Sequence, residues 1–218
     1  VDGNIGMKHQ GRFFEKSERG AGKFILDGTT SKHWFPKYLN DVDLPKQYNP
    51  DCGYVFSANN NPWDSTANSY VNGYYAELRA NKLFSYFESK EKFSVDDMKH
   101  LQLDNTNRFA ELSIPILLSF INEDSSGYKA SLKNWDAKYE LDDSLATFFE
   151  DWMELLEFEV WDEIYQYDQF LRYPDRIVLL DLIQFDPKSK FFDKLDTELK
   201  ESASTLIKST FEKTVLQC

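Results

Sequence analysis

Residues 53–62 of this chain read Gly53-Tyr54-Val55-Phe56-Ser57-Ala58-Asn59-Asn60-Asn61-Pro62. The first half of the stretch is apolar and aromatic, which favours a β-strand, whereas the second half holds three consecutive asparagines, a residue type that favours turns. The stretch therefore predicts a short strand that ends in an asparagine turn. Such a turn needs no function, because Asn side chains commonly hydrogen-bond to the backbone around them. An Asn amide fixed at a strand end is also a suitable N–H donor for the oxyanion that forms during acyl transfer.

Glycine and proline are concentrated around this stretch, on the N-terminal side of residue 70. Residues 1–70 contain seven of the nine glycines and four of the seven prolines, with short apolar runs at 24–26 and 54–56. This composition is typical of short strands joined by turns. Beyond residue 70 the apolar residues take helical spacing. We therefore predict an α+β protein with a strand-and-turn segment over residues 1–70 and a mainly α-helical region over residues 71–218.

Five helices are predicted in the second region. They span about 72–89, the residues from Ser94 onward, 105–120, 142–165 and 189–216. Ser94 and the acidic residues after it form a polar start that is typical of a helix N-terminus, and Pro115 should kink or restart the third helix. The side chains of the third helix expected to face the core are Phe109, Leu112, Ile116 and Phe120.

The helix predicted over 142–165 is strongly acidic. Residues 140–163 contain ten acidic residues and no basic residue. A cation site needs carboxylates that converge on one point, whereas these mostly fall on the side opposite the apolar stripe of the helix. We interpret them as a solvated face. A surface for a protein partner is the alternative interpretation of the same residues.

The composition argues against several classes of function. The formal net charge is −12 and no cluster of Lys and Arg offers a phosphate-binding face, so a nucleic-acid partner is not expected. No run approaches the ~20 apolar residues that cross a bilayer, so no membrane partner is expected either. Cys52 and Cys218 make neither a disulfide framework nor a metal site. The GxSxG, HExxH, Walker and GxGxxG motifs are absent from the sequence. The histidines, which share no spacing with other ligand types, are His9, His33 and His100.

Several segments, taken in order, resemble the penicillin acylase (penicillin amidase) family. They are Asp2-Gly3-Asn4-Ile5-Gly6; Gly11 and Gly28; Trp34; Leu44-Pro45-Lys46-Gln47-Tyr48-Asn49-Pro50; Gly53-Tyr54-Val55 to Asn59-Asn60; Leu78-Arg79-Ala80-Asn81-Lys82-Leu83; Phe93-Ser94-Val95-Asp96-Asp97-Met98; Leu101-Gln102-Leu103-Asp104; and Leu132-Lys133-Asn134-Trp135-Asp136. Each segment is short, and their common order over residues 2–136 carries the resemblance. It implies an internal fragment of the β chain of an N-terminal-nucleophile hydrolase, with part of an αββα core.

The resemblance also implies a chemistry. Family members cut themselves into two chains and expose a Ser whose own α-amine acts as its base, and this Ser attacks a linear amide to form an acyl-enzyme. By position, Asn59 is expected to contribute its side-chain amide to the oxyanion hole, and Arg79 to orient Asn59 or the substrate. The Ser should lie upstream of Asp2. We therefore expect the isolated chain to be inactive and to need the rest of its precursor as a partner before a small-molecule amide is cleaved.

The resemblance leaves the substrate open. A penicillin-type amide and an N-acyl-homoserine lactone would differ mainly in the acyl pocket, which Phe56 and Trp63 do not settle. The alternative is that residues 71–218 form a helical binding module of a homologue that has lost catalysis. The structural calcium of the family takes one ligand between the Asn and the Arg. Asp64 is the candidate there, but the spacing is shorter, so no metal or other cofactor is predicted. Family members are commonly exported, which implies a periplasmic or secreted location.

Overall fold

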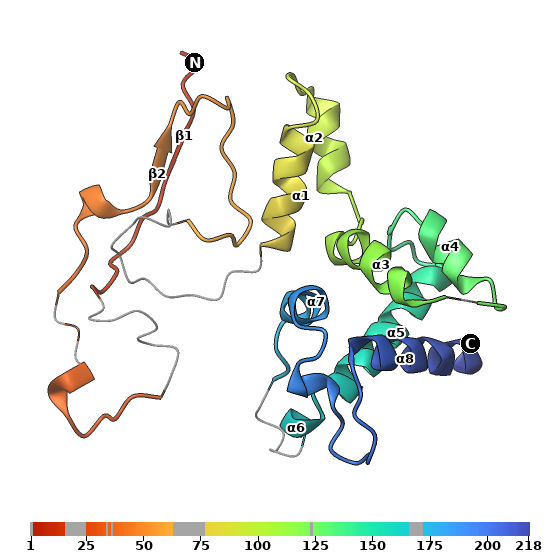
Figure 1. Cartoon of the computed structure of the whole chain (residues 1–218). Coiled ribbons are helices and arrows are strands. Elements are labelled where there is room, and N and C mark those ends of the chain that lie inside the picture. The colour runs from red at the N-terminus through yellow and green to blue at the C-terminus, as the bar shows by residue number, and fades with distance from the viewer. Residues whose placement is uncertain are drawn as a thin grey trace. The chain divides into compact units, whose positions relative to one another are not determined.

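The computed structural model of the chain describes residues 2–15, 25–33, 35, 37–62, 77–122, 124–165 and 172–218. The chain divides into two compact units, Val1–Ser94 and Val95–Cys218, called here the N-terminal unit and the C-terminal unit (Figure 1). About half of the chain is helical and its strands are short, so the predicted α+β class is confirmed. The boundary predicted near residue 70 lies outside the described residues.

The N-terminal unit contains a two-stranded antiparallel sheet of β1 (Gly6–Lys8) and β2 (Lys46–Tyr48). The side chain of Asn49 forms two hydrogen bonds at one end of this sheet. Its Oδ1 accepts a hydrogen bond from the Ile5 N–H at 2.9 Å, and its Nδ2 donates to Asn4 Oδ1 at 2.7 Å. Two of the segments that carry the family resemblance are thereby joined. Two short 3-10 helices, η1 (Ser31–His33) and η2 (Asp41–Asp43), lie between the strands in the sequence.

The strands predicted at 24–26 and 54–56 are wrong in position, since neither segment forms a sheet ladder within the described ranges. Phe24 itself lies outside those ranges. Residues 54–56 instead lie against the C-terminal end of helix α1 (Leu78–Phe87). The ring of Tyr54 stacks on that of Phe87 with centroids 4.9 Å apart. Ring stacking on a helix therefore takes the place of strand pairing.

A hydrogen bond adds to this contact. The Tyr54 hydroxyl donates to Glu88 Oε1 at 2.6 Å, directly after α1 ends. This bond to a carboxylate raises the pKa of Tyr54 to about 12, with a smaller contribution from desolvation. The segment before the asparagine turn is thus held to α1 by both apolar and polar contacts.

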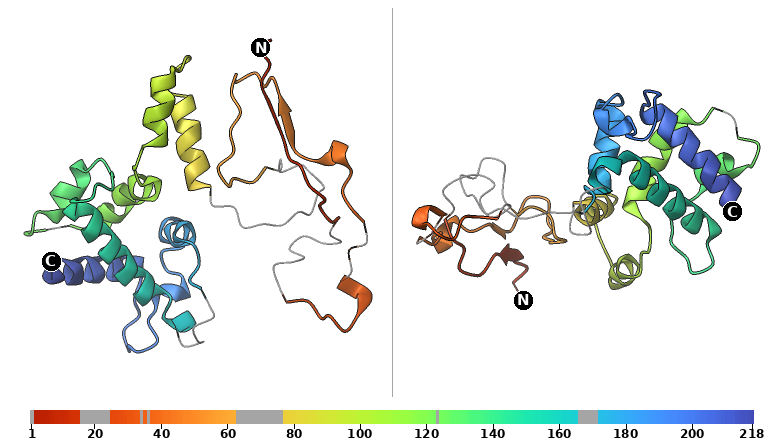
Figure 2. Two further views of the ribbon diagram at one scale, coloured as in Figure 1. Left: turned by 180° about the vertical axis from the view of Figure 1, so that it is seen from behind. Right: turned by 90° about the horizontal axis from the view of Figure 1, so that it is seen from below.

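The C-terminal unit is helical, with α5 and α8 at its core. Its helices are α2 (Val95–Gln102), α3 (Arg108–Phe120), α4 (Tyr128–Asn134), α5 (Ser144–Val160), α6 (Asp162–Tyr165), α7 (Arg176–Phe185), η3 (Lys190–Phe192) and α8 (Ala203–Gln217). Figures 1 and 2 show α5 and α8 side by side. The fully buried Trp152 of α5 packs edge-on against Phe211 of α8, with ring centroids 4.9 Å apart, and donates its Nε1–H to Thr210 at 3.2 Å. No helix in the described ranges is long and apolar enough to span a membrane.

Three of the predicted helices of this unit are confirmed, namely those beginning at Ser94 and those over 105–120 and 142–165. Pro115 does not interrupt α3. Of the four α3 side chains that we expected to face the core, Phe109 is buried and the other three are half-buried. Buried positions of the helix instead lie one residue after two of these three, at Ser113 and Leu117. The helix predicted over 189–216 is wrong in its first half, since only η3 precedes α8 there. Sequence periodicity missed α4 and α7.

The acidic residues of α5 are not mainly a solvated face, which corrects the expectation from the sequence. Glu159 has a side chain only 7% exposed and forms an ion pair with Lys213 of α8. Glu150 and Glu157 both pair with Arg176 of α7, at 2.7 and 3.0 Å. The physical reason is that α5 lies between other helices, so its polar flanks face the cations of α7 and α8 rather than water alone.

Candidate functional site

The asparagine turn predicted from the sequence is present at the end of residues 54–58. Asn59 has φ +59°, in the left-handed region that few residues other than Gly and Asn adopt without strain. Its side chain is exposed, whereas the preceding Ala58 is buried with 5% exposure. The turn therefore anchors its backbone at residue 58 and presents the next side chain outward.

The neighbouring Asn60 bonds to this backbone. Its side-chain Oδ1 accepts a hydrogen bond from the Ala58 N–H at 3.1 Å, so the bond spans Asn59. Its Nδ2 donates to the Asn61 carbonyl oxygen at 3.4 Å, a longer and weaker contact. Asn60 thus forms the local backbone bond expected of an Asn in a turn, whereas Asn59 is exposed and its expected donor role stays a prediction.

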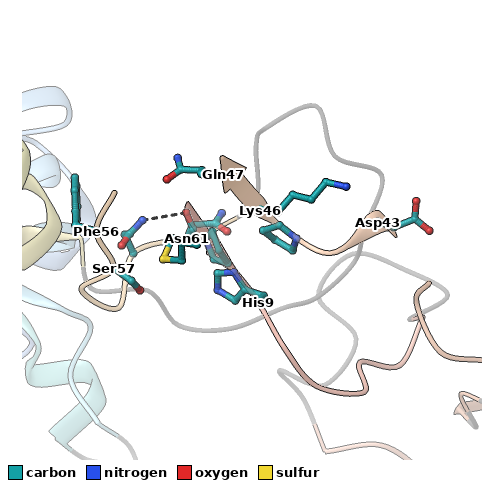
Figure 3. A pocket seen from close by; sticks show the side chains of 11 residues that line it. His9, Asp43, Lys46, Gln47, Phe56, Ser57 and Asn61 are labelled. Carbon is teal, nitrogen blue, oxygen red and sulfur yellow. Dashed lines mark hydrogen bonds between the residues drawn. The ribbon is translucent and has the colours of Figure 1, made fainter. Parts of the chain in front are cut away.

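A pocket of about 350 Å³ lies beside the turn (Figure 3). It is lined by Met7 and His9, by residues of the segment 43–47, and by Phe56, Ser57 and residues 60–62. The His9 Nδ1 atom is buried and has no hydrogen-bond partner among the described residues. Asn59 is not one of the lining residues. The pocket is therefore lined by residues before and after Asn59 in the sequence but not by Asn59 itself.

Arg79, the other predicted site residue, is the second residue of α1 and is exposed. Within the part of the chain that the structure describes, no hydrogen bond links it to Asn59. Residues 63–76, which connect the asparagine turn to α1, lie outside that part. The orienting role expected of Arg79 therefore stays a prediction.

The remaining titratable candidates show no convergent chemistry. Asp96, at the start of α2, pairs with Lys99 at 2.9 Å in a surface contact one helical turn apart. His100 is exposed on the same helix. No group of three or more His, Cys, Asp or Glu side chains could hold a metal ion within the described ranges, and Asp64 lies outside them. Among the described residues, the candidate that remains is the side-chain amide of Asn59 at the asparagine turn.

Comparison with family models assigns the chain to a known family. The family model described as penicillin amidase matches residues 1–218. The chain belongs to the penicillin amidase family. The resemblance found in residues 2–136 is thereby confirmed, and the match continues over residues 137–218.

A solved structure gives the fold relationship. The thermostable penicillin G acylase from Alcaligenes faecalis is similar to this penicillin amidase family chain, with a TM-score of 0.64 and 18% sequence identity. The likeness covers 97% of this chain and 44% of the acylase chain, so this chain spans less than half of the length of that protein. At this level of identity the likeness shows the fold alone. A search of curated protein sequences gives no match to the chain.

Proposed function

We propose that this chain forms part of an amide hydrolase and supplies, through Asn59, one hydrogen-bond donor of its oxyanion hole. The observation that carries the proposal is the conformation of Asn59. Its backbone is held at φ +59° between the buried Ala58 and the bonded Asn60, and its amide is exposed. Asn adopts this left-handed conformation more readily than other non-glycine residues, and a polar side chain exposed from a backbone held in it supports a functional role.

The proposed reaction follows the nucleophile chemistry of the family. The hydroxyl oxygen of an N-terminal Ser, carried by another part of the parent protein, attacks the amide carbonyl carbon while the α-amine of that Ser takes its proton. The carbonyl oxygen gains negative charge, and the Asn59 Nδ2–H donates to it. The C–N bond then breaks, and the amine leaves with the transferred proton. Water hydrolyses the resulting ester and releases the acid. One such donor typically contributes ~3 kcal/mol to the transition state.

The finer assignments belong to the same proposal. The substrate is a small molecule with a linear carboxamide, and the partner is the remainder of the precursor. Arg79 orients Asn59 or a polar group of the substrate from the start of α1. No step uses a metal ion. The proposal includes an exported location for the protein, and this part rests on the family resemblance alone.

The test is a kinetic comparison in the full-length parent protein. Asn59→Ala should lower kcat about 10²–10³-fold, because the donor acts on charge that develops in the transition state, and should leave KM nearly unchanged. Asn134→Ala is the matched control, since it removes an exposed amide that donates to the Ala130 carbonyl oxygen of its own helix. An unaltered kcat for Asn59→Ala would exclude Asn59 from the oxyanion hole.

The rival function is a helical binding module from a homologue without catalysis. The residue at the self-cleavage junction of the parent separates the two. A Ser, Thr or Cys there supports the hydrolase, and its replacement by a residue without a nucleophilic oxygen or sulfur supports the binding module.

A further inference from the structure

Asn60 lies next to the proposed donor and its side chain points back along the chain. The hydrogen bond from the Ala58 N–H to Asn60 Oδ1, at 3.1 Å, closes a short ring that contains the whole of Asn59. Ala58 is only 5% exposed, so one end of this ring is fixed in the protein interior. Asn60 itself is half-buried and lines the pocket beside the turn.

This ring restricts the backbone of Asn59, the residue of the turn that has a positive φ. Asn reaches the left-handed region more easily than most residues but also populates negative φ, so Asn59 would sample both conformations if the turn were free. Rotation about φ and ψ of Asn59 changes the separation between the Ala58 nitrogen and the Asn60 side chain. The hydrogen bond can therefore form only over a narrow range of those two angles, and that same range sets the direction of the Asn59 Cα–Cβ bond, from which the amide projects.

We infer that Asn60 is a positioning residue of the proposed reaction, which holds the Asn59 amide in the direction needed to meet the oxyanion. The inference rests on the function proposed above. Asn60 itself touches no reacting atom in this scheme. Its side-chain oxygen acts on the backbone, so its contribution reaches the substrate only through Asn59.

The test uses the parent protein and four variants at this turn. Asn60→Ala removes the acceptor and should lower kcat about 2- to 10-fold with KM unchanged, the range expected for the loss of one net hydrogen bond. The double variant with Asn59→Ala should be no slower than Asn59→Ala alone, because a residue that acts only through Asn59 has nothing left to position. A further loss of kcat in the double variant, or an unchanged kcat in Asn60→Ala, would overturn the inference.

Asn60→Asp keeps a side-chain oxygen that can accept the hydrogen bond from the Ala58 N–H, so it should rescue the kcat that is lost in Asn60→Ala. Its added negative charge would also oppose an oxyanion, so the rescue is measured at about 1 M salt, where the screening length is about 3 Å. We expect kcat to return towards that of the parent, and a kcat as low as that of Asn60→Ala would contradict the role of the acceptor. Asn60→Asp also serves where Asn60→Ala does not fold. The proposed function fails separately, through an unchanged kcat in Asn59→Ala.

Discussion

Arg176 of α7 is shared by two acidic side chains of the C-terminal unit. Its Nη1 lies 2.7 Å from Glu150 Oε2 and its Nε lies 3.0 Å from Glu157 Oε2, so one guanidinium pairs with two carboxylates of α5. The Glu157 side chain is 13% exposed, and burial raises the pKa of its carboxyl even though the charge of Arg176 acts in the opposite direction. Arg176→Met keeps an apolar stem but leaves both carboxylates without their cation.

The expected loss of stability can be worked out from exposure. Removing one partner of a fully buried ion pair costs about 3–5 kcal/mol. Here the Glu150 and Arg176 side chains are 33% and 25% exposed, so water screens part of the interaction. We therefore expect Arg176→Met to lower the free energy of unfolding by about 2–3 kcal/mol at neutral pH.

The pH dependence of this loss has a definite sign. The pKa of Glu157 is raised in the folded chain, so its titration favours the folded state below the ordinary value of 4.5, and this contribution is lost as the pH rises through the folded pKa. Without Arg176 the folded pKa of Glu157 rises further, since the guanidinium no longer favours the carboxylate. The difference in the free energy of unfolding between the unsubstituted chain and Arg176→Met is therefore largest at neutral pH, and it becomes smaller as the pH falls towards 5.

Urea unfolding of the 218-residue chain, followed by far-UV circular dichroism and Trp fluorescence at neutral pH and near pH 5, measures this difference. The matched control is Arg172→Met, which replaces an exposed arginine four residues earlier and should change stability by less than about 0.5 kcal/mol. A loss for Arg176→Met no larger than that of the control, or an equal loss at both pH values, would refute the reasoning.

Three further outcomes follow from the structure. Asp143→Ala should lower the free energy of unfolding by about 2–3 kcal/mol in the same assay, because Asp143 accepts hydrogen bonds from the Leu145 N–H at 2.8 Å and from the Trp135 Nε1–H at 2.6 Å. Asp143→Asn keeps one acceptor, so an equal loss in both variants would contradict this. Gly127→Ala should cost about 1 kcal/mol through its φ of +87° alone, since an added Cβ meets no atom within 4 Å, and an unchanged midpoint would contradict that. The isolated chain should not turn over a chromogenic phenylacetyl amide, and product above a blank would show that no nucleophile from elsewhere is needed.

The sequence predicted elements well where their ends carry local signals. The α3 and α5 helices begin after Asn107 and Asp143, whose side chains accept hydrogen bonds from the first turn, and both helices were predicted within a few residues. The α7 helix was missed, although Asp175 accepts the Ile177 N–H in the same way at 3.0 Å. Its ten residues are too few for periodicity to stand out, so the cap was the signal that could have located it.

Contacts between distant residues could not be predicted in this way. Glu159 pairs with Lys213 at a separation of 54 residues, and Glu157 with Arg176 at a separation of 19. The spacing of charges along one helix says which face they share, but it does not say which other helix packs against that face. The acidic residues were therefore assigned to solvent, and only the packing of α5 against α7 and α8 shows that several are paired.

The same distinction separates the two site residues. The backbone conformation of Asn59 is held by atoms of residues 58–60, namely the buried Ala58 and the acceptor oxygen of Asn60, so a short stretch of sequence contains most of the information about it. Arg79 is carried by α1, and its distance from Asn59 depends on how residues 54–56 pack their rings on that helix and on the course of the chain over 63–76. The conformation of Asn59 depends on neighbouring residues, whereas the distance between Arg79 and Asn59 depends on tertiary packing. The sequence therefore supports the proposed donor more strongly than its expected arginine partner.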